Sequence, residues 1–495
     1  MGNGTHCLAL DFGASSIRLV DISLANGRLS LDELARFAHA PRQQGGHLIW
    51  DYPAIYGQVE TALAAAAVSG RSYRSIGAAS WGVDYVLLDD DGALIAPPVS
   101  YRDGRTDGQV ERFTTQHISA ALLFEKTGLS ALPFNTLYQL YAQSQDEPEL
   151  LRRAHRLLFT ADYTHFWLGG VAGVETTLAS TSQMLTLDGS WWDEALATLA
   201  LQRSALLRPV PAGTMLGELS RRLQKRTGLP GIKVIAPAAH DTQSAILAVP
   251  ADEGGNWAYL SSGTWSILGT ESPVPYCTTE AREAGLGNER GYGGTYCVQF
   301  TVTGLWLVQE IQRLLADADA AGLAAEAGRA DAFRSLIDPA DARFFHPADM
   351  IAEIRAACRE AGEPVPETPA QLIRCAYESL ALLYRKRLRL LSDVTGRRFT
   401  RLHVVGGGSN AMMLNRLCAA TTGLPVLAGP TEATAIGNAL AQLIALGELS
   451  DVSQARRAVR LSFPPIAVEP QRLPGLDNAL ARFERLSTLR RQEPC

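Results

Sequence analysis

A short glycine turn appears twice in this chain of 495 residues, and the two copies constrain the fold more than any other feature. Residues 11–16 read DFGASS and residues 261–266 read SSGTWS, with Gly13 and Gly263 250 positions apart, about half the chain. Apolar, β-prone residues flank each copy, which predicts strand, tight turn and strand. The repetition predicts a protein built from two related halves.

The residues of these turns are suited to binding phosphate. A glycine followed by small hydroxyl residues allows backbone N–H groups and hydroxyls to converge on an anion. Two such hairpins that face each other would hold a polyphosphate between two domains. The pattern therefore predicts a phosphoryl-transfer or nucleotide-hydrolysing protein.

Composition favours small-molecule partners. The chain is 46% hydrophobic, long enough for two or three domains with their own cores, and carries a net charge of −6. Lys and Arg are scattered, so we expect no nucleic-acid partner and no membrane surface. Residues 1–6 lack the basic region followed by an apolar core that is typical of a secretion signal, and no apolar run is long enough to span a membrane, so the expected location is cytoplasmic.

The seven cysteines contain no CxxC pair, and the nine histidines show no HExxH spacing. We therefore expect reduced, mostly buried thiols and no transition-metal centre. Cys358 and Cys375 flank a proline-containing loop and could approach each other, but a reducing compartment disfavours a disulfide between them.

Periodicity predicts alternating short strands and helices in the first half. The expected strands are 6–12, 17–23, 33–39, 75–80 and 85–89, and the expected helices are 53–67, 106–118, 136–144 and 147–154. A boundary is expected near 246–256. In the second half, 370–391 should form a core-packing helix and 311–336 a solvated helix pair, while the tail beyond 465 should only pack on the surface.

Two carboxylates stand at positions suited to phosphoryl transfer, which needs a positioned nucleophile, cradled phosphates, a metal and often a base. Asp11 ends the first strand just before the first turn, where it could meet Mg²⁺ or only stabilise the turn. Asp241 follows an apolar strand and precedes a helix, so it could be a general base or an N-cap.

Three further segments carry ambiguous signals. Residues 404–410 read VVGGGSN, which permits close approach of adenine or phosphate, or is an ordinary loop. GxGxxG and GxxxxGK[ST] are absent, which disfavours a Rossmann dehydrogenase and a P-loop enzyme. Residues 80–85 and 101–105 suit a polyol site, or a buried aromatic cluster with an Arg–Asp ion pair.

Taken together, these motifs resemble the FGGY family of carbohydrate kinases, several of them in the form typical of its rhamnulokinase branch. The likeness runs in order over about residues 6–465. The motifs are 11–16, SWGVDYVLLD at 80–89, YRDGRT at 101–106, LPFNTLYQL at 132–140, AHDT at 239–242, YLSSGTWS at 259–266, GLWLVQ at 304–309 and VGGGSN at 405–410.

The resemblance implies an α/β fold of two actin-like, ribonuclease H-like domains with ATP and sugar in the cleft between them. It implies domains at 1–248 (sugar-binding) and 249–465 (ATP-binding), followed by a tail at 466–495. It also implies transfer of the γ-phosphate of ATP to the 1-hydroxyl of L-rhamnulose, with ATP and Mg²⁺ required and a monomer or small homo-oligomer as the expected assembly.

Site residues follow from the same resemblance. Asp241 matches the catalytic base and Asp11 the acid associated with Mg²⁺. The positions that match ATP contacts are Ala14, Ser15, Ser16, Ile17, Arg18, Thr264, Gln309 and Gly407. The positions that match sugar contacts are Gly82, His240, Asp241, Thr242 and Thr301.

The chain departs from the family pattern at three positions, of which Thr301 bears on the substrate. Ile17 replaces a common Gly, Thr301 replaces a sugar-contacting Asn, and Ser409 replaces an occasional Cys. The alternatives are therefore a kinase for another ketose such as L-fuculose, L-xylulose or xylulose, a non-catalytic sugar or nucleotide sensor, and an actin-like ATPase. The sensor would be expected to lose the base, yet Asp241 is present; the ATPase would need an interaction surface that the sequence does not show.

Overall fold

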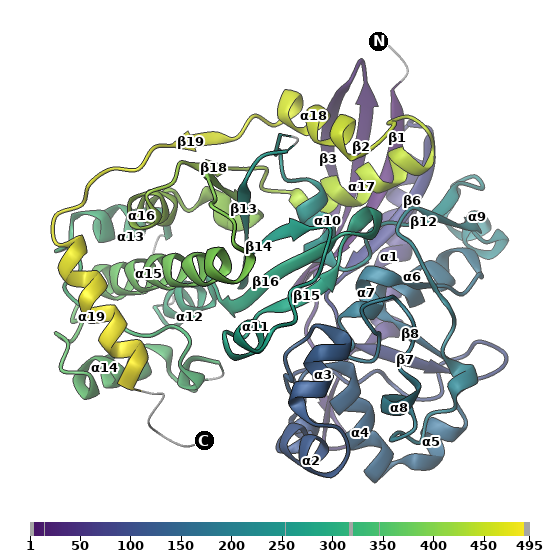
Figure 1. Ribbon diagram of the computed structural model, residues 1–495. Coiled ribbons are helices and arrows are strands. Elements are labelled where there is room, and N and C mark those ends of the chain that lie inside the picture. Colours follow the sequence, from purple (N-terminus) through teal and green to yellow (C-terminus); the bar gives the residue numbers. More distant parts are fainter. Residues whose placement is uncertain (1–3, 14, 253, 316–319, 346, 490–495) are drawn as a thin grey trace. The chain divides into compact units, whose positions relative to one another are not determined.

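The computed structural model describes residues 4–13, 15–252, 254–315, 320–345 and 347–489 (Figure 1). The chain divides into two compact units that interleave along the sequence. The first contains Met1–Asp252, Glu271–Val298 and Glu432–Phe463, and the second contains Glu253–Thr270, Gln299–Thr431 and Pro464–Cys495. The division at residue 248 expected from the sequence remains a prediction.

The first unit is an α/β layer structure. Its strands are β1 (Thr5–Phe12), β2 (Ser16–Ala25), β3 (Arg28–Ala38), β4 (Arg42–Gln44), β5 (His47–Ile49), β6 (Tyr73–Ser80), β7 (Tyr85–Leu88), β8 (Arg156–Phe159), β9 (Val174–Glu175), β10 (Pro209–Val210), β11 (Thr214–Glu218), β12 (Lys233–Ala236) and β15 (Gly287–Arg290). Its helices are α1 (Tyr52–Ala67), α2 (Gln109–Gln116), α3 (Ala120–Thr127), α4 (Thr136–Asp146), α5 (Pro148–Arg152), α6 (Thr160–Gly169), α7 (Thr176–Ser180), α8 (Asp193–Leu196), α9 (Arg221–Thr227), α10 (Asp241–Leu247), α11 (Thr279–Glu283), α17 (Ala433–Ala445) and α18 (Val452–Ser462).

The main sheet of this unit has the order β11-β12-β6-β1-β2-β3. β1 runs antiparallel to β2 and parallel to β6, so the predicted hairpin is confirmed, with Phe12 opposite Ile17. The turn closes through a hydrogen bond from Gly13 N to the Ser16 carbonyl of 3.0 Å. Residues 7–12 of β1 are all buried because helices cover both faces of the sheet.

The two faces of β1 have different neighbours. Leu8, Leu10 and Phe12 join the hydrophobic core that includes α1. Since successive side chains alternate between faces, Asp11 points to the opposite face. Helix α17 contacts β1 and β6, and its Asn438 Nδ2 donates to the Leu10 carbonyl at 3.1 Å. Asp11 therefore lies on the side of the sheet that α17 covers.

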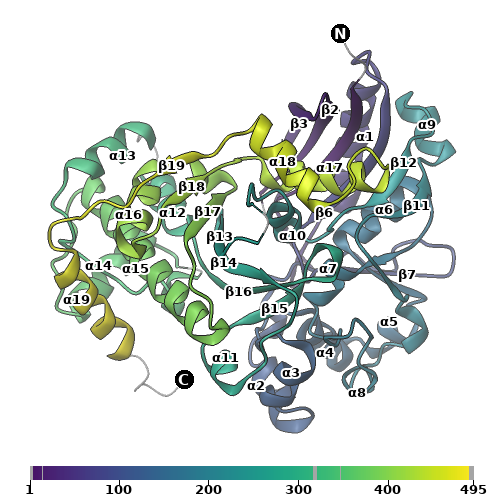
Figure 2. The same cartoon turned by 45° about the horizontal axis from the view of Figure 1, so that its top comes forward.

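Helices α10 and α17 lie side by side in Figures 1 and 2 and cross at a glycine. A Cβ added to Gly437 would lie 1.7 Å from the backbone carbonyl oxygen of Ser244. No side chain fits at this position, so the crossing depends on glycine. Because α10 begins at Asp241, the close contact between the two helices also sets the position of Asp241 relative to α17.

The second unit is built around strands of a seven-stranded sheet with the order β15-β16-β14-β13-β17-β18-β19. The further strands are β13 (Trp257–Ser262), β14 (Trp265–Ser272), β16 (Tyr296–Thr303), β17 (Arg401–Val405), β18 (Val426–Ala428) and β19 (Ile466–Val468). The further helices are α12 (Trp306–Leu314), α13 (Ala320–Arg329), α14 (Met350–Glu360), α15 (Pro369–Thr395), α16 (Met412–Thr422) and α19 (Leu476–Leu489). Short 3₁₀ helices in the two units span 104–106, 203–205, 292–294, 342–344 and 407–410.

The second predicted hairpin is confirmed. β13 and β14 are antiparallel, with Ser262 opposite Ser266, and Gly263 N donates to the Trp265 carbonyl at 2.9 Å. β13 is parallel to β17, as β1 is to β6. The two halves therefore share a hairpin beside a parallel strand, which is the repeat expected from the sequence.

The long helix of the second unit is the predicted core helix. Helix α15 begins at a capping box between Thr368 and Gln371. Its buried residues include every position that the sequence placed on one apolar face: Leu372, Ala376, Leu380 and Leu383. The 311–336 region is less solvated than expected, because Leu323 and Ala327 of α13 are buried.

The expectation for the tail is wrong in part. β19 pairs with β18, and Phe483 and Ala479 of α19 are buried. The Arg482 guanidinium also forms an ion pair with Glu363. Apolar residues within the arginine-rich tail, rather than its overall composition, decide that it packs into the unit.

The described cysteines are all free thiols, and all except Cys277 are fully buried. Cys358 and Cys375 are among them, so the structure contains no disulfide between these two residues. The expectation of reduced, mostly buried thiols is confirmed for the described part of the chain.

Candidate active site

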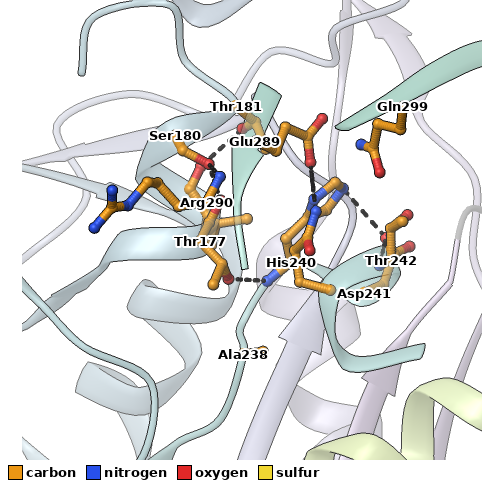
Figure 3. Close-up of polar contacts among 12 residues, drawn as sticks. Thr177, Ser180, Thr181, Ala238, His240, Asp241, Thr242, Glu289, Arg290 and Gln299 are labelled. Carbon is orange, nitrogen blue, oxygen red and sulfur yellow. Dashed lines mark hydrogen bonds and ion pairs between the residues drawn. The ribbon is translucent and has the colours of Figure 1, made fainter. Parts of the chain in front are cut away.

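Asp241 is the first residue of α10, and residues 237–240 connect β12 to this helix. Its Oδ1 accepts hydrogen bonds from Thr242 N at 2.6 Å and from Thr242 Oγ1 at 3.2 Å (Figure 3). The helix N-cap is His240, so Asp241 is not the N-cap that the sequence allowed as an alternative. Burial raises the pKa of Asp241 to about 6, with Asp11 adding to the rise and His240 opposing it. A carboxylate of this kind can accept a proton near neutral pH.

His240 lies between two carboxylates. Its Nδ1 is 2.9 Å from Glu289 Oε2, and its Nε2 is 3.4 Å from Asp241 Oδ1 (Figure 3). Burial alone would lower the pKa of His240, but Glu289, Asp241 and Glu175 outweigh it and raise the pKa to about 9. The imidazole is therefore a cation at neutral pH, next to the candidate base.

Glu175 holds the backbone that leads into this site. It is fully buried, its carboxylate caps α7 by accepting from Thr177 N at 2.9 Å, and it accepts from Ala239 N at 3.0 Å. Thr177 Oγ1 in turn accepts from His240 N at 3.2 Å. Helix α7 thus fixes the main chain immediately before Asp241.

Asp11 forms an ion pair within the first hairpin. Its side chain is buried and pairs with Arg18, the residue opposite it in the β1–β2 register. The same guanidinium also pairs with Glu432, the residue before α17. Burial raises the pKa of Asp11, and Arg18 opposes this rise. A single half-buried arginine therefore links the candidate metal ligand to a second carboxylate.

The other candidate ATP contacts of the first hairpin differ in accessibility. Ser15 is exposed and Ser16 is half-buried, whereas the Ile17 side chain is fully buried in the core. The main chain of Ile17 is not exposed either, because Ile17 lies opposite Phe12 of β1 and opposite Phe37 of β3. Ala14 lies outside the described residues.

Gly82 is the partly exposed residue of the Trp81–Asp84 segment. A Cβ at Gly82 would lie 2.9 Å from the Thr181 side chain. The next residue, Val83, has φ of 69°, and Asp84 N donates to the Gly82 carbonyl at 2.9 Å. This γ-turn is strained for a β-branched residue, and such strain is typical of functional sites.

The segment around this turn is a buried aromatic cluster, one of the two alternatives that the sequence left open. Asp84 accepts from Trp50 Nε1 at 2.7 Å and from Trp81 Nε1 at 2.9 Å, and burial raises its pKa to about 6. The expected Arg–Asp pair takes another form: Asp103 pairs with His47, and Arg105 donates to Gln139 at 2.8 Å. A ligand would therefore meet mainly the main chain of Gly82 here.

The second unit brings together its own set of predicted residues. Thr264 Oγ1 donates to Gln309 Oε1 at 3.1 Å, joining the second turn to α12. The glycine cluster packs on the same hairpin, because a Cβ at Gly408 would lie 2.0 Å from Ser262 Oγ. Gly407 is exposed with open space beside it, and Thr301 of β16 is also exposed.

Sequence reasoning missed two carboxylates of the first unit: Glu289, which pairs with His240, and Glu432, which pairs with Arg18. Neither belongs to a motif, and each is far in the sequence from its partner, so only the folded chain brings the two together.

No group of three or more His, Cys, Asp or Glu side chains suited to a metal ion occurs within the described residues. Nor does any helix in that part of the chain have the length and apolar character to cross a membrane.

Known proteins resemble this chain over almost its full length. Rhamnulokinase from Bacteroides thetaiotaomicron is 40% identical over 477 residues, covering 96% of this chain and 98% of that protein. Rhamnulokinase from Klebsiella pneumoniae (strain 342) is 41% identical over 482 residues, covering 97% and 96%. The crystal structure of gluconate kinase from Lactobacillus acidophilus has a TM-score of 0.81 at 17% identity over 99% and 98% of the two chains, a likeness of fold.

The family profiles cover both halves. The N-terminal domain of the FGGY family of carbohydrate kinases matches residues 6–248, and its C-terminal domain matches residues 258–446. The two-domain α/β fold expected from the sequence is confirmed. This chain therefore belongs to the FGGY family of carbohydrate kinases and is an enzyme of that class.

Proposed function

We propose that this enzyme transfers the γ-phosphoryl group of ATP to the 1-hydroxyl of L-rhamnulose, giving L-rhamnulose 1-phosphate. The observation that carries the proposal is the identity of about 40%, over almost the full length, to proteins named rhamnulokinase. A cytoplasmic location, a soluble sugar as partner and a monomer or small homo-oligomer belong to the same proposal.

Asp241 is the proposed general base. Its carboxyl is 29% exposed, so a substrate hydroxyl can reach it, while burial keeps its pKa near 6. Above that pH the carboxylate is ionised and can take the proton from the 1-hydroxyl as the oxygen attacks phosphorus. His240, Thr242, Gly82 and Thr301 are the proposed sugar contacts.

The remaining proposed residues bind the nucleotide. Thr264, Gln309 and Gly407 of the second unit are accessible for ATP, as are Ser15 and Ser16 in the first. Ala14, Ile17 and Arg18 complete the proposed set, of which Ile17 is fully buried. Mg²⁺ bound to ATP neutralises phosphate charge during transfer. Asp11 fits this ion chemically, since Mg²⁺ prefers carboxylate oxygens, and Arg18, which now pairs with Asp11, would have to share or release that carboxylate when the ion binds.

A coupled assay of ADP release tests the proposal. The purified enzyme is given ATP and a panel of L-rhamnulose, L-fuculose, L-xylulose and D-xylulose. We expect the highest kcat/KM with L-rhamnulose and a product phosphorylated at carbon 1 by NMR. A preference of tenfold or more for another ketose would overturn the substrate assignment while leaving the carbohydrate kinase intact.

Thr301 is expected to relax sugar discrimination. A threonine offers one hydroxyl where the family pattern has an amide, so one substrate hydroxyl loses a direct partner, which costs about 0.5–1.5 kcal/mol. The variant Thr301→Asn should therefore raise the ratio of kcat/KM for L-rhamnulose over L-fuculose by about three- to tenfold. An unchanged ratio would show that Thr301 does not contact the discriminating hydroxyl.

Asp11 is expected to control the metal requirement. The variant Asp11→Asn keeps the shape but removes the charge, so the Mg²⁺ concentration for half-maximal activity should rise by about 10–100-fold. The control is Asp21→Asn, in which a buried aspartate of the same hairpin also loses an arginine partner, Arg71. An equal response of both variants would assign Asp11 a purely structural role.

A further inference from the structure

Glu289 has a largely buried carboxylate that contacts His240, the residue before the candidate base. It belongs to none of the motifs found in the sequence. It comes from β15, 49 positions after His240 in the sequence, and its side chain is 14% exposed. Its Oε2 is 2.9 Å from His240 Nδ1 and also accepts from Gln243 Nε2 at 2.9 Å. On its other side, His240 presents Nε2 to Asp241 (Figure 3).

We propose that Glu289 is a positioning residue for phosphoryl transfer: its carboxylate orients the His240 ring toward Asp241 and keeps that ring in its cationic form. The inference rests on the proposed role of Asp241 as base and adds a residue to it. A cation 3.4 Å from Asp241 favours the ionised carboxylate, which is the form able to accept a proton.

Helix α7 accepts backbone hydrogen bonds from both segments that carry Glu289 and His240. Ser180 Oγ of α7 accepts from Arg290 N at 3.0 Å, next to Glu289, and Thr177 Oγ1 of the same helix accepts from His240 N. On the far side of Glu289, Asn288 N donates to the Gly128 carbonyl at 2.9 Å. Because its neighbours are fixed, the Glu289 carboxylate holds a defined position relative to the imidazole.

The charges that face the two titrating groups are distributed over several elements. His240 is faced by Glu289 of β15, Asp241 of α10 and Glu175 of β9, all acidic. Asp241 is faced by His240 and by Asp11 of β1. Three carboxylates thus support one imidazolium, and Glu289 is the one in contact with the ring nitrogen remote from Asp241.

The pH profile of Glu289→Gln tests this role. The amide keeps the size of the side chain but removes one of the three carboxylates that support the imidazolium, so the pKa of His240 falls, more of the ring is neutral, and the pKa of Asp241 rises. In the wild type, kcat/KM should fall as pH decreases through about 6. In Glu289→Gln this acidic limb should move upward by about one pH unit or more, with KM for ATP unchanged.

Two matched variants complete the kinetic experiment. Glu289→Asp keeps the charge and should keep the acidic limb within about half a pH unit of the wild type. Glu60→Gln removes a carboxylate of α1 that is 18% exposed and paired with Arg226, and it should leave the limb in place. A limb that does not move in Glu289→Gln, or that moves equally in Glu60→Gln, overturns the proposal.

A direct measurement keeps the test independent of catalysis and of the stability of the variant. NMR of ¹³C,¹⁵N-histidine-labelled wild type, with His240 assigned by His240→Asn, should show that the His240 ring is an imidazolium at neutral pH and loses its proton only at about pH 9. A neutral ring at pH 7 overturns the inference even if the enzyme is active. Conversely, an enzyme inactive on every ketose but with a charged His240 would overturn the proposed function and leave the Glu289–His240 relationship standing.

Discussion

Replacement of Asp241 by asparagine is expected to lower kcat by about 10²–10⁴ while ATP binding persists. The amide keeps the shape and can still accept the hydrogen bond from Thr242 N, but it cannot take a proton from the attacking hydroxyl. The loss corresponds to about 3–5 kcal/mol of transition-state stabilisation. Steady-state ADP release gives kcat, and calorimetry with an ATP analogue gives the nucleotide affinity.

The matched control is Asp193→Asn. Asp193 is also the first residue of a short helix in the same unit, but its side chain is 80% exposed and pairs with Arg203. A surface carboxylate of this kind contributes little, so activity should stay near the wild-type value. If Asp241→Asn retains activity within threefold of wild type, Asp241 stabilises the start of α10 and another group accepts the proton.

Local sequence signals were sufficient for much of the fold. The hairpins around Gly13 and Gly263 were predictable because strand propensity and turn chemistry act over a few residues. The apolar face of α15 was predictable for the same reason, since its spacing repeats every turn of the helix. Asp241 was placed correctly at the start of a helix by the strand that precedes it.

Long-range contacts were not predictable from local signals. Glu432 reaches Arg18 across 414 positions of the sequence, and only the parallel strands and the helices between them bring the two together. Glu289 reaches His240 in the same way. Ile17 could be assigned to an ATP-binding turn, but the burial of its side chain follows from the packing of α1 on the sheet. These are properties of topology, not of sequence spacing.

The glycine at the α10–α17 crossing leads to the second large expected effect. In Gly437→Ala, the added methyl group would overlap the Ser244 carbonyl, which belongs to the backbone and cannot rotate away. The two helices must separate, which should cost about 3 kcal/mol or more of folding free energy. Thermal unfolding should show a clearly lower midpoint than that of the wild type.

The same substitution should also impair catalysis, because α10 carries Asp241 at its first position. A shift of about 1 Å in a catalytic group can lower the rate by about 10²-fold, so kcat should fall even in the fraction that remains folded. The control is Gly57→Ala, a glycine of α1 with open space around it, which should stabilise the protein by about 0.5–1 kcal/mol and leave kcat unchanged. If Gly437→Ala behaves like Gly57→Ala in both measurements, α10 has room to move, and the position of Asp241 must be fixed from the α7 side, through Glu175 and Thr177.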